Sequence, residues 1–216
     1  MGTMYTALRT LLVGNGLLTG GLLTGGLLTG GLLTGCLEFG DVEQGRVIAF
    51  DREKGSCTLI RDGGVPGKPN YSMLPPVQYA LPDDAAEMGA EPAAGLLMAV
   101  DSSSHHLVVY DEAAGAFKQV PFTPISLKEG VDRKDPLVFD RESNKAKAFP
   151  QLDRDQRTLT LYVKSAKQLL TVGLADEYLG MPEASWHFGD EVRIYHHGAQ
   201  KASRFMNVSR TDIYAK

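Results

Sequence analysis

The chain has 216 residues, of which 43% are hydrophobic, and it carries 22 basic and 26 acidic side chains. The apolar content is sufficient to bury a core in one domain or in two small ones. The slight negative charge argues against a nucleic-acid-binding protein, which would carry a clustered basic patch. Here basic and acidic residues alternate instead, as in residues 51–54 (DREK).

Residues 1–35 have the composition of an export signal. Arg9 is their only charged side chain, and the pentapeptide GLLTG occurs four times in succession between residues 16 and 35. A basic start, an apolar run and small residues before a processing point are typical of a secretory signal peptide. Without this leader, residues 36–216 carry 21 basic and 26 acidic side chains, a net charge of −5.

The leader ends in residues 33–36 (LTGC), which are an aliphatic residue, two small residues and a cysteine. This motif resembles the lipobox of bacterial lipoproteins. The resemblance implies cleavage before Cys36, attachment of a diacylglycerol to its thiol and anchoring of the processed chain to a membrane. Leu37, where an aspartate would imply retention at the inner membrane, implies delivery to the outer membrane. We therefore expect a lipid-anchored protein of the cell envelope that faces the periplasm.

Two alternatives remain open for this region. About 20 apolar residues suffice to span a bilayer, so one alternative is a retained transmembrane helix. A repeat of five residues turns successive G-x-x-x-G pairs by about 140° and gives no single glycine face for helix pairing. The other alternative is a disulfide between Cys36 and Cys57, the only other cysteine in the chain.

The rest of the chain consists of short apolar segments separated by turn-forming residues, a pattern typical of antiparallel strands. Strands are expected at residues 45–50, 56–60, 77–81, 95–101, 107–110, 117–122, 148–152, 158–163, 168–173, 191–195 and 202–208. A short helical turn is expected within residues 83–94 and a charged linker within residues 127–147. Because no long segment has a period of 3.6 residues, we predict an all-β protein.

The second half of the chain resembles the first. Residues 50–60 (FDREKGSCTLI) align without a gap with residues 152–162 (LDRDQRTLTLY), and each half ends in a hairpin with two histidines at its first turn. This order predicts a tandem duplication, with chance similarity between β meanders as the alternative. Each copy has about five strands, as in a small Greek-key barrel of the OB type. The predicted organisation is a signal peptide (1–35), a tether (36–44) and two OB-like barrels (45–130 and 131–216).

Residues 188–195 (FGDEVRIY) and 198–209 (GAQKASRFMNVS) resemble the closing hairpin of small exported OB-like domains of unknown function in bacteria. From Cys36 to its end, the chain also resembles an uncharacterised lipoprotein family of sulfate-reducing bacteria. This resemblance implies a class of exported protein and brings no known activity with it.

The candidates for a metal site are His105, His106, His196 and His197. Neighbouring residues on a strand point to opposite faces, so neither pair can bind a metal ion alone. A copper or zinc site requires one histidine of each pair to meet across the two barrels. Solvated turn histidines are the alternative.

We assign no catalytic residue and expect no cofactor. The chain lacks the G-x-S-x-G elbow of a hydrolase nucleophile, and its acidic pairs, such as Asp83 and Asp84, flank turns in polar sequence. The first hypothesis is therefore an envelope-anchored, non-enzymatic lipoprotein that serves as a protein-interaction or accessory module of a membrane or periplasmic complex. The second is a periplasmic lipoprotein that binds a metal or a small ligand, and the third is a hydrolase-type enzyme.

Overall fold

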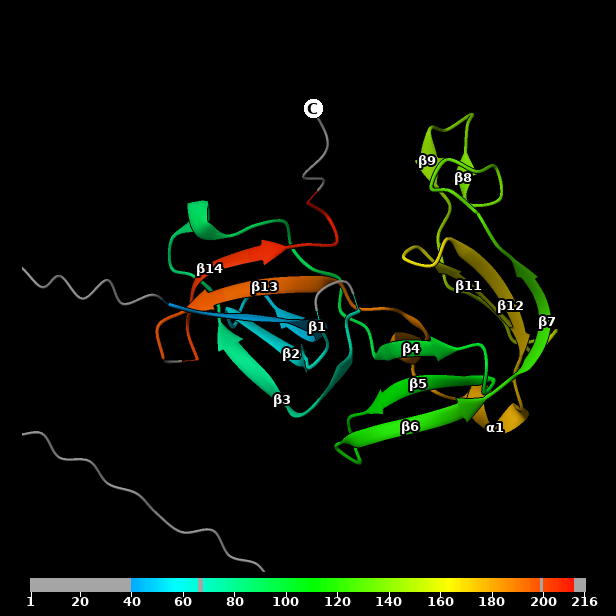
Figure 1. Ribbon diagram of the computed structural model, residues 1–216, viewed down its shortest axis with the longest axis horizontal. Helices are drawn as coiled ribbons and strands as arrows, with labels where there is room; N and C mark the ends of the chain where they lie inside the picture. Colours follow the sequence, from blue (N-terminus) through cyan, green and yellow to red (C-terminus); the bar gives the residue numbers. More distant parts are fainter. Residues whose placement is uncertain (1–39, 66–67, 199, 212–216) are drawn as a thin grey trace, which may run out of the picture. The chain divides into compact units, whose positions relative to one another are not determined.

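The computed structural model describes residues 40–65, 68–198 and 200–211 (Figure 1). Strands predominate in these residues and pair in antiparallel sheets, so the predicted all-β class is confirmed. The chain divides into a unit of residues 1–37 and a unit of residues 38–216, and the fold below is that of the second unit. The predicted leader (1–35) and Cys36 lie outside the described residues.

The strands are β1 (Asp41–Asp51), β2 (Ser56–Asp62), β3 (Tyr71–Ala80), β4 (Leu97–Asp101), β5 (His106–Asp111), β6 (Ala116–Pro121), β7 (Thr123–Lys128), β8 (Phe139–Asp140), β9 (Lys145–Ala146), β10 (Gln151–Asp153), β11 (Thr158–Val163), β12 (Gln168–Gly173), β13 (Glu191–His196) and β14 (Ala202–Asn207). The helical segments are η1 (Ala85–Glu87), α1 (Asp176–Leu179) and η2 (Glu183–Trp186). The strands form four sheets, in the orders β14-β13-β1-β2-β3, β10-β11-β12-β7, β4-β5-β6 and β8-β9.

The five-stranded sheet is a Greek key. Strands β1, β2 and β3 form a meander, and β13 returns after the long connection of residues 81–190 to pair with β1. The resulting order β13-β1-β2-β3 defines this topology. β14 extends the sheet, and a parallel bridge between Ala80 and Lys201 joins the two edge strands at one end. The sheet is therefore a partly open barrel of OB-like type.

The prediction of two tandem barrels, 45–130 and 131–216, is wrong, because two of the sheets take strands from both halves. β1 pairs with β13 in one sheet, and β7 pairs with β12 in another. The reason is that β1, β2, β3, β13 and β14 bury a common set of apolar side chains. β1 also begins at Asp41, inside the predicted tether 36–44.

The sequence likeness between the two halves comes from a shared hairpin turn. After each of five aspartates the chain turns in four residues, and the aspartate carboxylate accepts a hydrogen bond from a backbone N–H of the turn. The bonds are Asp51 to Lys54, Asp101 to Ser103 and Ser104, Asp111 to Ala113 and Ala114, Asp140 to Glu142, and Asp153 to Gln156. The last turn residue has a positive φ, which explains the glycines Gly55 and Gly115 at that position.

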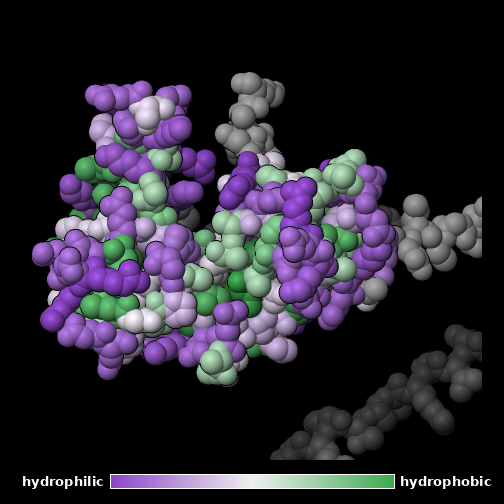
Figure 2. Space-filling model, turned by 180° about the vertical axis from the view of Figure 1, so that it is seen from behind, coloured by the Kyte–Doolittle hydropathy of each residue, from purple (hydrophilic) through white to green (hydrophobic). Residues whose placement is uncertain are grey.

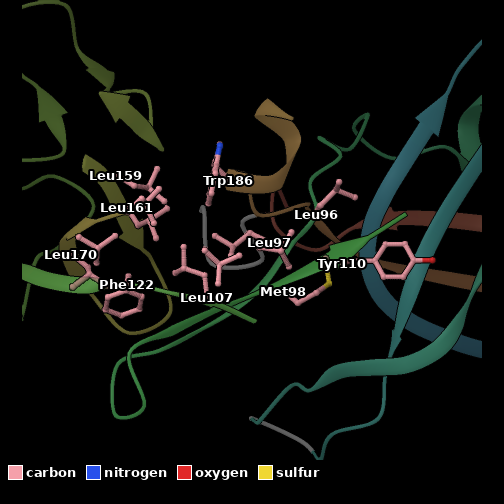
Figure 3. Packing of buried hydrophobic residues seen from close by; sticks show 14 of the residues in the cluster. Leu96, Leu97, Met98, Leu107, Tyr110, Phe122, Leu159, Leu161, Leu170 and Trp186 are labelled. Carbon is pink, nitrogen blue, oxygen red and sulfur yellow. The ribbon is translucent and has the colours of Figure 1, made fainter. Parts of the chain in front are cut away.

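The core has two parts. Inside the barrel lie Val47, Cys57, Leu59, Tyr79, Val192, Ile194, Ala202 and Phe205. The larger part unites side chains of the three-stranded and four-stranded sheets around Trp186, which is fully buried (Figure 3). Ile48, Ile60 and Tyr71 of the barrel belong to this second part. Strands β1, β2 and β3 therefore contribute side chains to both parts of the core.

Exposed apolar side chains are dispersed over several elements. They are Val42, Val65, Met73, Leu74, Ile125, Leu127 and Leu137. On the face shown in Figure 2, hydrophobic residues are interspersed among hydrophilic ones. Polar grooves are therefore the better candidates for a specific binding site.

The aspartate turns predict a defined pH dependence. Hydrogen bonds from Ser103 and Ser104 hold the pKa of Asp101 well below its usual range. Its charged form therefore stabilises the fold above the unfolded-state pKa of about 4, and this stabilisation is lost as the pH falls toward the folded-state pKa. Asp101→Asn keeps an acceptor oxygen but not the charge. We expect its urea midpoint to lie below that of the wild type at pH 7, and the gap to be smaller at pH 2.5, part of the way down to the folded-state pKa.

The control for this measurement is Glu112→Gln, which removes a carboxylate from the exposed part of the next turn. It should lower the urea midpoint at pH 7 less than Asp101→Asn does. A gap between wild type and Asp101→Asn that is the same at both pH values would contradict the assignment.

Candidate functional site

A shallow groove lies at the mouth of the barrel, where the β1–β2 turn, the end of β3 and the β13–β14 turn meet. We call it the barrel-mouth groove. It has a volume of about 360 Å³ and is lined by Lys54, Gly55, Ser56, Gln78, Ala80 and Gln200. In barrels of the OB type, the second and third strands and the loops after the first and fourth strands bind ligands. The groove occupies the corresponding place in this Greek key.

Backbone hydrogen bonds hold the walls of the groove together. The Ala80 N–H donates to the Gln200 carbonyl oxygen at 2.9 Å, and the Leu81 N–H donates to the Gly55 carbonyl oxygen at 2.8 Å. Gly55 has φ of 60°, and open space lies where a side chain would project from it. One wall is therefore bare backbone, and the groove is formed before any ligand arrives.

The lining chemistry suits a neutral polar ligand. Gln78 and Gln200 carry amides and Ser56 a hydroxyl, and both kinds of group donate and accept hydrogen bonds. The charge of Lys54 is offset by Asp51, whose carboxylate oxygen lies 2.9 Å from its Nζ. Such a surface can pair with the amides of an extended peptide, whereas a bound ion would find little net charge.

A second polar cluster is buried where the barrel meets the three-stranded sheet. The Arg46 guanidinium lies 4.3 Å from the ring centre of Tyr71 and 5.0 Å from that of Phe188. Its Nη1 donates to the carbonyl oxygens of Leu97 and Met98, both at 3.2 Å. The pairing of β4 with β5 is irregular between Leu97 and Ala99, so these carbonyls belong to a bulge.

Carboxylate and amide groups complete this cluster. The Tyr71 hydroxyl donates to Glu191 Oε2 at 2.6 Å, and the Gln44 amide donates to the other oxygen of the same carboxylate. Burial lowers the pKa of Arg46, and burial together with the Glu191 hydrogen bond raises the pKa of Tyr71. The Tyr71 hydroxyl therefore stays protonated at neutral pH, and the cluster joins the sheets rather than presenting a reactive group.

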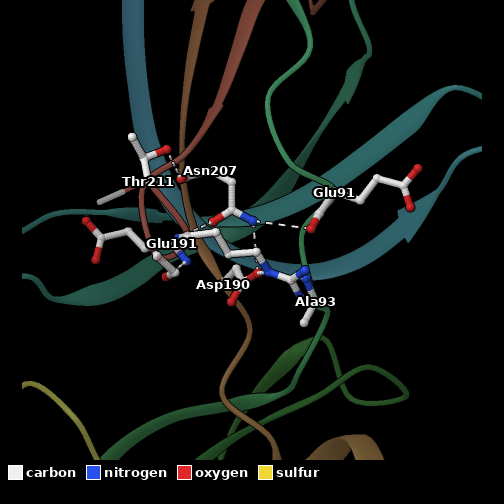
Figure 4. A network of polar contacts seen from close by, with 8 residues as sticks. Glu91, Ala93, Asp190, Glu191, Asn207 and Thr211 are labelled. Carbon is white, nitrogen blue, oxygen red and sulfur yellow. Dashed lines mark hydrogen bonds and ion pairs between the residues drawn. The ribbon is translucent and has the colours of Figure 1, made fainter. Parts of the chain in front are cut away.

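A third network fixes the end of the barrel (Figure 4). Asp190 Oδ2 accepts hydrogen bonds from Ala93 N, Asn207 Nδ2 and Arg210 Nε, each at 2.9 Å. Asn207 is fully buried and also donates to the Glu91 carbonyl oxygen. The carboxylate of Asp190 is thus satisfied within the fold, and its role is structural.

The two histidine pairs lie in different sheets. His105 occupies the β4–β5 turn against Phe122, with ring centres 5.7 Å apart, and His106 begins β5. His196 ends β13, is 9% exposed and lies 5.3 Å from the Tyr79 ring. His197 follows it in the turn. Within residues 40–65, 68–198 and 200–211, no group of three or more His, Cys, Asp or Glu side chains is placed to hold a metal ion.

Cys57 lies in the barrel core and is completely buried. Burial raises the pKa of its thiol to about 12, so the thiolate is scarce at neutral pH. The side chain serves as a small apolar core residue, which agrees with its position inside an apolar strand.

No helix in the described part of the chain is long and apolar enough to cross a membrane.

The fold and the groove define an all-β protein built around a partly open Greek-key barrel. The chain belongs to the family described as Domain of unknown function (DUF4881), which matches residues 38–216. Comparisons with curated proteins and with solved structures give no significant match. The family match begins at the same residue as the second unit of the chain.

The barrel-mouth groove was missed by sequence reasoning because its residues come from three distant segments. Its one sequence signal is the Asp51 turn with Gly55, which also occurs at turns without a groove. Arg46 was missed because a single arginine in an apolar strand looks like a solvent-facing residue. The local pattern holds no sign of the two carbonyls that it contacts.

Arg46→Ala tests the buried cluster. The change removes two hydrogen bonds from a charged group and the stacking against two rings, so we expect the free energy of unfolding to fall by about 3 kcal/mol. Urea denaturation measures this loss. Arg204→Ala is the matched control, because Arg204 is exposed and its ion pair with Glu87 lies at the surface. The control should lose less than about 1 kcal/mol, and equal losses would contradict the role of Arg46.

Proposed function

We propose that this protein is a lipid-anchored, non-enzymatic binding module of the bacterial cell envelope. The main support for the proposal is that the predicted processed chain, the second unit of the chain and the family match begin within two residues of one another. The LTGC motif ends at Cys36, and both the second unit of the chain and the family match begin at residue 38. Cleavage before Cys36 therefore removes the leader and leaves the whole of the second unit attached to the lipidated residue.

The tether implied by this processing is short. β1 begins at Asp41, so residues 37–40 separate it from Cys36 and span at most about 14 Å. Each buried CH₂ of an acyl chain contributes roughly 0.8 kcal/mol, and stable anchoring requires more than one chain. A diacylglycerol on Cys36 thus supplies an anchor and keeps the barrel beside the membrane surface.

The barrel-mouth groove supports binding of a protein partner rather than catalysis. Its amides and hydroxyl match the hydrogen-bonding pattern of an extended peptide, and the one amine in its lining, Lys54, is paired with Asp51. The groove is also open, which suits a segment that continues in both directions. The module would thus hold a neighbouring envelope protein by a polar segment.

Lipidation is tested by metabolic labelling with a clickable fatty acid. The wild type and Cys57→Ala should incorporate the label, because Cys57 is buried in the core. Cys36→Ala should incorporate none and should remain uncleaved. Labelling of Cys36→Ala at the wild-type level would refute the lipid anchor.

Partner binding is tested by a photoreactive amino acid at Gln78, inside the groove. We expect one discrete cross-linked protein, and Gln200→Arg should abolish it by filling the groove with a charged side chain. The matched position is Glu112 in the β5–β6 turn, where no such adduct should form. An adduct that survives Gln200→Arg, or one that forms equally at Glu112, would place the contact elsewhere.

A further inference from the structure

A second groove lies between the segment that follows β7 and the β11–β12 turn. We call it the basic groove. It has a volume of about 420 Å³ and is lined by Asp132, Arg133, Lys134, Tyr162, Lys164 and Lys167. Four of these six side chains are cationic and one is anionic, although residues 36–216 together carry a net charge of −5. The groove is therefore a local reversal of the charge of the protein.

The two walls of the basic groove are held in place by three contacts. The Val131 N–H donates to the Lys167 carbonyl oxygen at 2.8 Å, and the Tyr162 hydroxyl donates to the Val131 carbonyl oxygen at 2.9 Å. Lys167 Nζ lies 2.7 Å from Asp132 Oδ1. Residues 132–135 form a turn closed by a hydrogen bond from the Asp135 N–H to the Asp132 carbonyl oxygen. The cationic side chains therefore lie on turns that hydrogen bonds and an ion pair hold in place.

The charge that remains is positive. Asp132 forms an ion pair with Lys167, and this pairing raises the pKa of Lys167. Arg133, Lys134 and Lys164 have no ion-pair partner within 4 Å among the residues that the structure describes. All three are exposed at the rim. A ligand that fills the groove meets three uncompensated cations.

The floor of the groove restricts the ligand further. The Tyr162 ring is half-buried and lies against Phe149, with ring centres 6.1 Å apart. Because its hydroxyl already donates to Val131, the side-chain donors left to a ligand are those of the cations. A ligand that pairs with these cations must offer acceptors and carry negative charge. Phosphate groups meet both conditions, since arginine binds them with two parallel bonds and lysine with a point charge.

We propose that the basic groove binds a ligand that carries phosphate groups. Two sources share this chemistry, a soluble phosphate compound and the headgroup of an anionic phospholipid. The proposal is independent of the lipid anchor, because it stands on the groove alone.

The test uses the full chain in neutral detergent and isothermal titration calorimetry with two probes, inorganic pyrophosphate and the short-chain lipid dihexanoylphosphatidylglycerol. The groove variant is Arg133→Gln/Lys164→Gln, which leaves the Lys167–Asp132 pair and therefore the walls intact. The control variant is Lys118→Gln/Arg204→Gln, which removes the same number of cations elsewhere in the fold.

We expect the wild type and the control to bind at least one probe, and the groove variant to bind that probe about tenfold more weakly or worse. Binding of pyrophosphate identifies a soluble ligand, and binding of the lipid alone identifies a headgroup. Absence of binding by the wild type to both probes overturns the proposal. An equal loss of affinity in both double variants also overturns it, because binding would then follow net charge alone.

Discussion

The interaction on which the rest of the structure depends is the buried guanidinium of Arg46. A charged group removed from water is unfavourable unless it is hydrogen-bonded, and here Arg46 Nη1 donates to two carbonyl oxygens of β4 beside a bulge. The rings of Tyr71 and Phe188 both lie against the cation. Arg46 thereby joins the barrel to β4, the first strand of the inserted sheets, which are those formed by residues 81–190. Ile48 and Ile60 of the barrel bury their side chains in the larger part of the core.

The local alternation of apolar and polar residues predicts several strands correctly. Residues 158–163 and 168–173 were predicted as strands and form β11 and β12 with the same bounds, because their apolar residues alternate and charged turns flank them. β3 begins at Tyr71, earlier than the predicted strand at residues 77–81, because an edge strand tolerates the two prolines within residues 71–76. The predicted linker 127–147 contains the end of β7 and the small hairpin β8–β9. Every residue of β7 is exposed, so no alternation marked it.

Pairing between distant segments could not be predicted in the same way. A four-residue turn after an aspartate closes five hairpins of the described residues, so the likeness of residues 50–60 and 152–162 suggested two equal domains. In the fold, one of these hairpins lies in the barrel and the other in the four-stranded sheet. Both grooves depend on such long-range contacts. The cations of the basic groove come from two segments, residues 132–134 and 162–167, and only folding brings them together. The LTGC motif, in contrast, is contiguous and can be read directly, and it remains a prediction.

The central structural claim is that the Arg46 contacts unite the barrel and the inserted sheets into one cooperative unit. Native-state hydrogen exchange tests it most directly, through the amides of Ile194 in β13 and Leu107 in β5, both of which are fully buried. Two amides in one cooperative unit should open with the same free energy, and Arg46→Ala should lower both by the same amount. If the Leu107 amide opens at a much lower free energy than the Ile194 amide, and Arg46→Ala leaves the Ile194 value unchanged, the barrel folds independently and the account is wrong.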